Sequence, residues 1–249
     1  MHFEILGPLR VVASSGKPVP LARGRIRQLL KVLLLVGEPT SEDRLCDWLS
    51  DRGRPMGGST LRTHITALRR QLRSEGYRML STSEGYLIVT YPGEVDLQIF
   101  RECAAQGSSA LLANDNVAAA RLLEQAFALC REPLLADFPD SVALSSHRME
   151  LLEYTRLVAE QLMEARMRLH RHREAVAGLR ALAETDPPNE HTYGQLMLAL
   201  YRSGRRAEAT QAFLILRKRL AESFGLDPGP AITDLYHRIL ADAPDLHMS

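Results

Sequence analysis

The sequence predicts an α+β domain followed by an all-α domain, and two observations lead to this fold class. Residues 1–96 contain short β-like runs before and after a group of helical stretches, whereas residues 97–249 are one helical stretch after another, rich in alanine and leucine. Charge divides at the same place, because residues 1–96 carry 14 Lys and Arg against 10 Asp and Glu, and residues 97–249 carry 17 against 20. A chain of 249 residues is long enough for two cores of ordinary size. We therefore expect two domains, with the basic excess in the first.

The composition narrows the class of protein. With 45% hydrophobic and 24% charged residues, the chain has the proportions of a soluble globular protein. It has no apolar run of membrane-spanning length, and its first residues lack the pattern of a secretory signal, so we expect a cytoplasmic protein that contacts no membrane. The three cysteines, Cys46, Cys103 and Cys130, are far apart in no C-x-x-C pair, which favours reduced core thiols over a redox or metal role.

The first domain begins with strands and two helices. Residues 1–22 contain three short β-like runs, FEILG, LRVVA and PVPLA, with a Ser-Ser-Gly-Lys turn between the last two. A leucine-rich helix is expected over residues 25–36, where a glycine and then a proline end it. Thr40 or Ser41 can cap the next helix, which has two acidic residues in its first turn.

The stretch STLRTHITALRRQLR, residues 59–73, predicts a helix that Ser59 can cap. Its apolar side chains recur at the spacing of one buried stripe, namely Leu61, Ile65, Leu68 and Leu72. The outer face holds small, hydrogen-bonding and cationic side chains, and no acidic residue lies in the helix to neutralise its arginines. A polyanion along this face would neutralise them, as a helix in a DNA major groove requires. The alternative on this stretch alone is an ordinary arginine-rich surface helix.

A hairpin is expected next, because YRMLSTSEGYLIV contains two β-like runs around a polar turn with glycine. Helix, helix, loop, helix and hairpin is the order of a winged helix-turn-helix. The runs TLRTHITALRRQL and MLSTSEGYLI resemble the recognition helix and wing of OmpR-type winged-helix domains. FEILGPLRV, LLKVLLL and SEDRLCDWL are similar to one branch of these, the Streptomyces antibiotic regulatory proteins, and the resemblance covers nearly the whole chain.

With this resemblance, the residues of the first domain receive expected roles at DNA. The residues at the centre and along one flank of the outer helix face are expected to contact base edges; they are Arg62, Thr63, Thr66 and Arg70. Four residues are expected to contact the DNA backbone, namely His64, Arg69, Arg73 and Arg27. The wing tip, with Ser81, Thr82 and Ser83, is expected at the adjacent minor groove, and Tyr86 either packs beneath the wing or touches a phosphate. Arg52 and Arg54 lie in the loop that faces RNA polymerase in OmpR-type domains.

The second domain shows a weak internal repeat. Arg-Glu-Ala at residues 173–175 and Ala-Glu-Ala at residues 207–209 each follow a polar turn, and their separation matches the tetratricopeptide period of about 34 residues. Tyr201, Gly204, Ala209 and Phe213 fit such a unit, and a fainter copy lies near residue 111. The closing segment resembles the bacterial transcriptional activation domain, which in this regulator family is associated with self-association and activation. The fold expected for the whole chain is an α+β winged helix-turn-helix domain, residues 1–96, followed by an all-α tetratricopeptide-like helical-repeat domain, residues 97–249.

Motifs for other functions are missing. The sequence has no Gly-Lys-Ser or Gly-Lys-Thr phosphate loop and no hydrolase or deaminase motif, so we expect no enzyme and no cofactor. His170 and His172 could bind a metal, but without an accompanying cysteine or carboxylate cluster they are interpreted as turn residues, and no metal site is expected.

The resemblance implies a transcriptional activator for a biosynthetic, antibiotic-type gene cluster. Its expected partners are double-stranded promoter DNA with direct repeats, RNA polymerase through sigma and other subunits, and a second copy of itself on DNA. Such a protein would be nucleoid-associated. The rival hypothesis is a helical-repeat adaptor that recognises a peptide and whose winged-helix domain has lost DNA binding.

Overall fold

The computed structural model describes residues 1–22, 24–50, 55–73, 79–139, 141–184 and 187–246. It divides into two compact units. Unit 1 combines Met1–Ala104 with Gln125–Thr155, and unit 2 combines Ala105–Glu124 with the chain from Arg156 onward. In the described part of the chain, no helix has both the length and the apolar character needed to cross a membrane.

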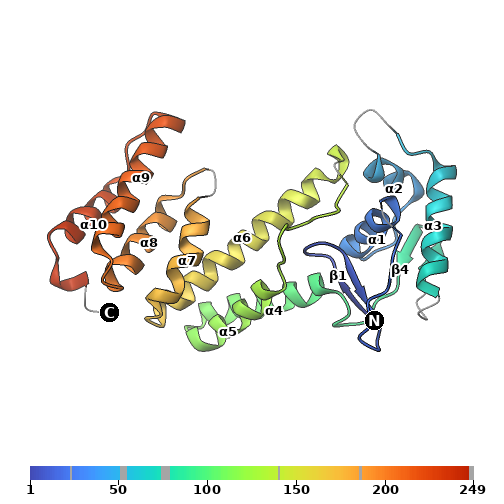
Figure 1. Cartoon of the computed structure of the whole chain (residues 1–249), viewed down its shortest axis with the longest axis horizontal. Helices are drawn as coiled ribbons and strands as arrows, with labels where there is room; N and C mark the ends of the chain where they lie inside the picture. Colours follow the sequence, from blue (N-terminus) through green and yellow to red (C-terminus); the bar gives the residue numbers. More distant parts are fainter. Residues whose placement is uncertain (23, 51–54, 74–78, 140, 185–186, 247–249) are drawn as a thin grey trace. The chain divides into compact units, whose positions relative to one another are not determined.

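Near its N-terminus, unit 1 contains short strands and the helices α1, α2 and α3 (Figure 1). They are β1 (His2–Glu4), β2 (Arg10–Val12), α1 (Arg25–Val36), α2 (Glu42–Leu49), α3 (Gly58–Arg73), β3 (Met79–Thr82) and β4 (Gly85–Ile88). β1 pairs with β2 and β3 pairs with β4, both antiparallel. The first helix and the hairpin are therefore confirmed. The third expected strand is reduced to one bridge, between Val12 and Pro18, because its prolines cannot donate ladder hydrogen bonds.

The helix ends show which cap residues were correctly identified. Gly37 closes α1 in the left-handed conformation, with φ of 68°, and its N–H donates to Leu33 O. Ser41 caps α2 by accepting a hydrogen bond from Arg44 N at 3.3 Å, whereas Thr40 is buried in a bridge to the hairpin. The expected cap at Ser59 is wrong, since α3 already begins at Gly58.

The core of unit 1 lies where α1, α2 and α3 meet. α1 contributes a nearly continuous run of buried leucine and valine side chains over residues 29–35, as its leucine-rich sequence predicts. Trp48 of α2 and the apolar stripe of α3 complete this core. Phe100, whose side chain is fully buried, packs edge to face against Tyr154 with ring centroids 5.5 Å apart.

A later part of the chain returns to unit 1, and residues 131–139 are here named the return segment. Leu135 N donates to Leu6 O at 2.9 Å, and Arg131 forms an ion pair with Glu4 at 3.0 Å. The chains approach closely because residue 7 is glycine: a Cβ there would lie 2.6 Å from the carbonyl oxygen of Arg131. The return segment therefore belongs to the packing of the N-terminal strands.

A buried lysine links α1 to the return segment. Lys31 is fully buried, and its Nζ donates to Gly7 O at 2.7 Å and to Ala136 O. The same ammonium lies 4.7 Å from the ring centroid of Phe138. Burial lowers the pKa of Lys31 to about 8, although the carboxylates of Asp137 and Asp96 favour its charged form. The Lys31 ammonium thus links α1 to Gly7 between the N-terminal strands and to Ala136 of the return segment.

The remaining secondary-structure elements of the described residues are helices. They are α4 (Asp96–Leu112), α5 (Asn116–Ala128), the short 3₁₀ helix η1 (Val142–Leu144), α6 (Ser145–Arg168), α7 (His172–Ala183), α8 (Glu190–Arg202), α9 (Arg206–Phe224), α10 (Pro230–Leu240) and the 3₁₀ helix η2 (Pro244–Leu246). Helices α4, α5 and α6 have residues in both units. In unit 2, α7, α8, α9 and α10 lie side by side (Figure 1).

The helical hairpins of unit 2 share one turn geometry. His170 after α6 and Gly204 after α8 both adopt positive φ, 57° and 77°. In each case the next residue donates its N–H to the carbonyl five positions earlier, at 2.9 Å. The helices that follow these turns, α7 and α9, begin at His172 and Arg206, which are separated by the same interval as the two sequence motifs. The predicted repeat is therefore present in the backbone.

Candidate nucleic-acid interface

Helix α3 separates an apolar face from a cationic one. The predicted stripe of Leu61, Ile65, Leu68 and Leu72 is buried, with at most 2% of any side chain exposed. On the opposite side Arg62, Thr63, Thr66, Arg70 and Arg73 are exposed, and His64 and Arg69 are half-buried. The periodicity therefore identified both faces. Seven of the expected DNA-contacting residues lie on this one helix.

The two exposed threonines have fixed hydroxyl groups. Thr63 Oγ1 donates to Ser59 O at 3.0 Å, and Thr66 Oγ1 donates to Arg62 O at 2.9 Å. Each hydroxyl hydrogen is therefore used within the helix, while the oxygen can still accept a hydrogen bond from outside. Such a surface can accept from a base amino group and contact a thymine methyl group.

The β3–β4 hairpin, the expected wing, is anchored to the start of α2. Thr40 N donates to Tyr86 O at 3.0 Å and Tyr86 N donates to Thr40 O at 2.9 Å, so the residue before α2 pairs with β4. Gly85 makes this approach possible, because it has φ of 137° and a Cβ there would lie 2.0 Å from Thr40 O. At the tip, residues 81–84 are exposed. The close pairing of the β3–β4 hairpin with Thr40, just before α2, thus depends on a glycine.

Replacing Gly85 with Ala is expected to lower the free energy of unfolding by about 1–3 kcal/mol, because alanine disfavours this backbone conformation and its Cβ collides with Thr40. Urea denaturation of the full chain measures the effect. Gly194→Ala is the control, since a Cβ at that helical position meets only an ordinary contact at 3.8 Å from Leu235. Equal stability of the two variants would contradict this account of Gly85.

Arg69 connects α3 to the wing. Its guanidinium donates to Ser81 Oγ and lies 5.6 Å from the centroid of the Tyr86 ring. The structure therefore brings together Arg69, Ser81 and Tyr86, which the sequence assigned to the DNA backbone and the wing. Tyr86 is half-buried, so part of its surface lies in solvent, and its contact with a phosphate stays a prediction.

Two groups of expected site residues lie elsewhere. Arg27 donates to Leu9 O at 2.6 Å and to Asp137 at 3.1 Å, so its guanidinium is engaged at the return segment, and its contact with a phosphate stays a prediction. Burial alone would raise the pKa of Asp137, but hydrogen bonds from Arg27 and Leu9 N lower it overall. Arg52 and Arg54 lie outside the described residues.

One residue near this interface was missed in the sequence. Glu42, in the first turn of α2, forms an ion pair with Arg62 at 3.0 Å. The hydrogen bond and charge of Glu42 raise the pKa of Arg62. The sequence placed Glu42 only at the positive end of the α2 dipole, because an ion pair between residues 20 positions apart follows no local periodicity. A search of the neighbouring helices for an acidic residue that could pair with an arginine of residues 59–73 would have suggested Glu42.

The described residues contain no group of three or more His, Cys, Asp or Glu side chains that could hold a metal ion. All three cysteines are thiols. Burial raises the pKa of Cys130 to about 12, so this thiol stays protonated at neutral pH.

Residues 95–240 match the family model of the bacterial transcriptional activator domain. The regulatory protein DnrI of Streptomyces peucetius is 30% identical over 99% of this chain and 94% of that protein. The regulatory protein AfsR of Streptomyces griseus is 33% identical over 96% of this chain, which spans only 24% of AfsR.

Among solved structures, EmbR of Mycobacterium tuberculosis, determined in complex with a low-affinity phosphopeptide, aligns with a TM-score of 0.82. The two chains are 28% identical, and the alignment covers 98% of this chain and 65% of the EmbR chain. The similarity therefore includes both the α3 region and the helices that follow it.

Proposed function

Since the chain belongs to the Streptomyces antibiotic regulatory protein family of transcriptional activators, we propose that it binds promoter DNA through α3 and the wing. Unit 1 then serves as an OmpR-type winged helix-turn-helix with α3 as its recognition helix. The observation that carries the proposal is the outer face of α3, which presents arginines and threonines and no acidic residue of its own. This mixture suits a major groove, where short side chains allow close approach and arginines bind guanine edges or phosphates.

Each residue of the interface has a proposed role. Arg62, Thr63, Thr66 and Arg70 face base edges, because they are the exposed residues along the centre and one flank of the helix. His64, Arg69 and Arg73 hold phosphates at its margins. The exposed wing tip, with Ser81, Thr82 and Ser83, reaches the adjacent minor groove, and Tyr86 supports it from below. Half or more of the hydrogen bonds in such interfaces fall on the backbone, which fixes the register of the reading helix.

We also propose that two copies bind direct repeats head to tail and associate through the helical repeats of the acidic half. The recurring turn and its spacing along the chain support a tetratricopeptide-like arrangement, which stacks helix pairs into a surface for protein partners. Repeats about one helical turn apart, roughly 10 base pairs, place both copies on one side of the duplex. Activation then follows from recruitment of RNA polymerase, with Arg52 and Arg54 in the contacting loop, at promoters of a biosynthetic gene cluster.

The direct test of the proposed interface is Arg70→Ala. We expect a loss of about 1–3 kcal/mol in binding to the promoter site and a smaller loss on random duplex DNA, because a base-reading arginine adds discrimination. Fluorescence anisotropy with a footprinted site from the neighbouring promoter measures both affinities. Arg121→Ala, at an exposed position of α5, is the control. Equal losses on both DNAs would restrict Arg70 to phosphate contact.

A cavity of about 360 Å³ among α7, α8 and α9 favours a second candidate function, that of a peptide-binding adaptor. Its walls include Leu196, Leu200, Ala212 and Ile215, and such apolar surfaces bind side chains of peptide ligands. The two functions differ in salt dependence, because DNA affinity driven by phosphate contacts falls steeply as salt rises. Promoter binding that is absent even at low salt would favour the adaptor.

A further inference from the structure

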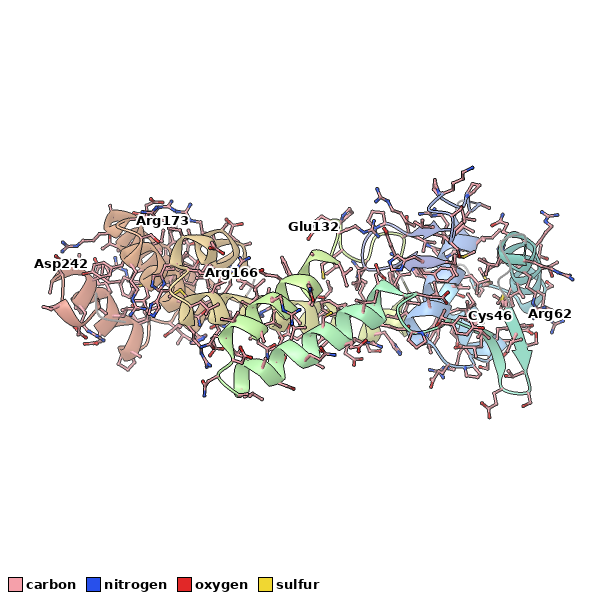
Figure 2. All side chains as sticks on the ribbon, turned by 90° about the horizontal axis from the view of Figure 1, so that it is seen from below. Cys46, Arg62, Glu132, Arg166, Arg173 and Asp242 are labelled. Carbon is pink, nitrogen blue, oxygen red and sulfur yellow. The ribbon has the colours of Figure 1, made fainter. Side chains whose placement is uncertain are left out.

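Arg62 and Glu42 form a two-point contact between α3 and α2. Arg62 Nε donates to Glu42 Oε2 at 3.2 Å, and Nη2 lies 3.0 Å from Oε1, so both carboxylate oxygens are used. The Arg62 side chain is 69% exposed and that of Glu42 only 28%. Figure 2 shows Arg62 on α3 at the surface of its unit. The carboxylate is thus a partly covered support beneath an arginine that reaches into solvent.

Glu42 has room to reach Arg62 because α3 begins with glycine. A Cβ at Gly58 would lie 2.4 Å from Glu42 Oε1, inside any real contact distance. Glu42 is also free of capping duty, since Ser41 supplies the side-chain cap of α2. The local sequence therefore leaves the carboxylate of Glu42 available for Arg62.

The contact with Glu42 leaves the outer end of the Arg62 guanidinium available to bind a base. A guanidinium has five N–H donors, and Glu42 occupies the edge formed by Nε and Nη2. The end formed by Nη1 and the second N–H of Nη2 still presents two parallel donors. Two such donors match N7 and O6 of guanine in the major groove. We propose that Glu42 is a positioning residue that holds Arg62 for recognition of one guanine, an inference that rests on the proposed DNA-binding function.

A carboxylate at this place acts on specificity more than on affinity. Glu42 repels phosphates and reduces the attraction of Arg62 for them, which weakens binding to any sequence. It also restricts the rotamers of a side chain that otherwise loses much conformational freedom on binding. Held in this way, Arg62 contacts a phosphate less readily. Its binding to a base then costs less side-chain conformational entropy. The fold gains little from the pair, because exposed ion pairs contribute little to stability.

The experiment compares Glu42→Gln with Asp43→Asn in the full chain. Both changes remove one negative charge from the first turn of α2, and Asp43 is exposed. Each protein selects binding sites from a randomised duplex library, and the enriched sequences give the base preference at every position. We expect wild type to prefer guanine at the Arg62 position by roughly 5- to 150-fold and Arg62→Ala to lose this preference.

Glutamine offers one acceptor oxygen and turns an NH₂ donor toward the guanidinium, so it cannot form the two-point contact. Glu42→Gln is therefore expected to lose roughly 3- to 10-fold of the guanine preference at that position alone. Asp43→Asn should keep the wild-type preference. Both variants should bind random DNA more tightly because each has lost one repulsive charge, and Glu42→Gln more so, because it also frees Arg62 to contact phosphates.

Gly58→Ala provides an independent variant that keeps every charge. The added methyl group takes the place of the Glu42 carboxylate, while alanine favours the helix. Gly58→Ala should weaken the guanine preference at the same base position as Glu42→Gln. Its affinity for random DNA should rise less than that of Glu42→Gln, because the negative charge of Glu42 is retained.

A guanine preference that survives in both Glu42→Gln and Gly58→Ala would overturn the positioning role, and so would an Arg62→Ala protein with an unchanged consensus. A wild-type protein that enriches no sequence at all would instead refute the proposed DNA-binding function. The two failures are therefore distinguishable.

Discussion

Residues 1–96 expressed alone are expected not to fold stably, whereas residues 1–168 are expected to unfold in one cooperative transition. The shorter fragment lacks the return segment, so Leu6 O loses its partner Leu135 N and Glu4 loses Arg131. It also lacks Phe100, whose buried ring contributes about 1.5–3 kcal/mol. With about 0.5–1.5 kcal/mol for each of these two lost contacts, the total is about 2.5–6 kcal/mol, which is comparable to the lower end of the stability of a small domain, about 5–15 kcal/mol.

Urea denaturation followed by circular dichroism and by the fluorescence of Trp48 measures this prediction. Both fragments contain Trp48, the single tryptophan, which is buried in α2. The full chain is the reference for a folded unit 1. A steep and coincident transition in residues 1–96, with a midpoint near that of the longer fragment, would show that the return segment adds little to the fold.

Replacement of Lys31 with Met is expected to lower the free energy of unfolding by about 2–4 kcal/mol at neutral pH. Methionine fills the space of the lysine stem but leaves the carbonyls of Gly7 and Ala136 without their donor. Lys17→Met, at an exposed position, is the control and should change stability by less than about 0.5 kcal/mol. A Lys31→Met protein as stable as wild type would mean that the desolvation cost of the buried ammonium, which lowers its pKa, offsets its hydrogen bonds to the two carbonyls.

The same variant gives a pH dependence with a definite sign. The folded-state pKa of Lys31, about 8, lies below its ordinary value of 10.5. Between these values the unfolded chain keeps a proton that the folded chain has released, so raising the pH stabilises the folded state by up to about 1.4 kcal/mol per unit. Thermal melts of wild type and Lys31→Met should therefore diverge from pH 8 upward, with wild type gaining. A constant difference would show that Lys31 titrates normally.

The sequence predicted those features that depend on local periodicity. The buried and outer faces of α3 follow from leucine and isoleucine at helical spacing, and the bounds of α1 follow from its leucine run and Gly37. The internal repeat of unit 2 was visible because the same turn recurs after equivalent helices. In each case the residues that specify the element lie within it or directly beside it.

Contacts between distant residues could not be read in this way. Nothing local in α1 indicates that Lys31 donates to the carbonyl of Ala136, 105 positions later, and a lysine in a leucine run predicts solvent exposure. Glu42 was visible as an acid at a helix start, but its distance from Arg62 depends on how α2 crosses α3. Chain packing, more than propensity, therefore determines the details of the candidate site.

The return segment has a consequence for how such regulators can be recombined. Because unit 1 is completed by residues that follow α5 in the chain, a hybrid of two relatives joined near residue 96 would combine Lys31 from one parent with residues 131–139 from the other. Such a hybrid keeps its fold only if the second parent supplies equivalents of Arg131 and Ala136 at compatible positions. A single crossover between two related genes near residue 96 therefore gives a folded protein only if α1 and the return segment of the two parents pack together. On the proposed function, engineered promoter specificity is better sought by transplanting the outer residues of α3 and the β3–β4 hairpin onto an intact chain.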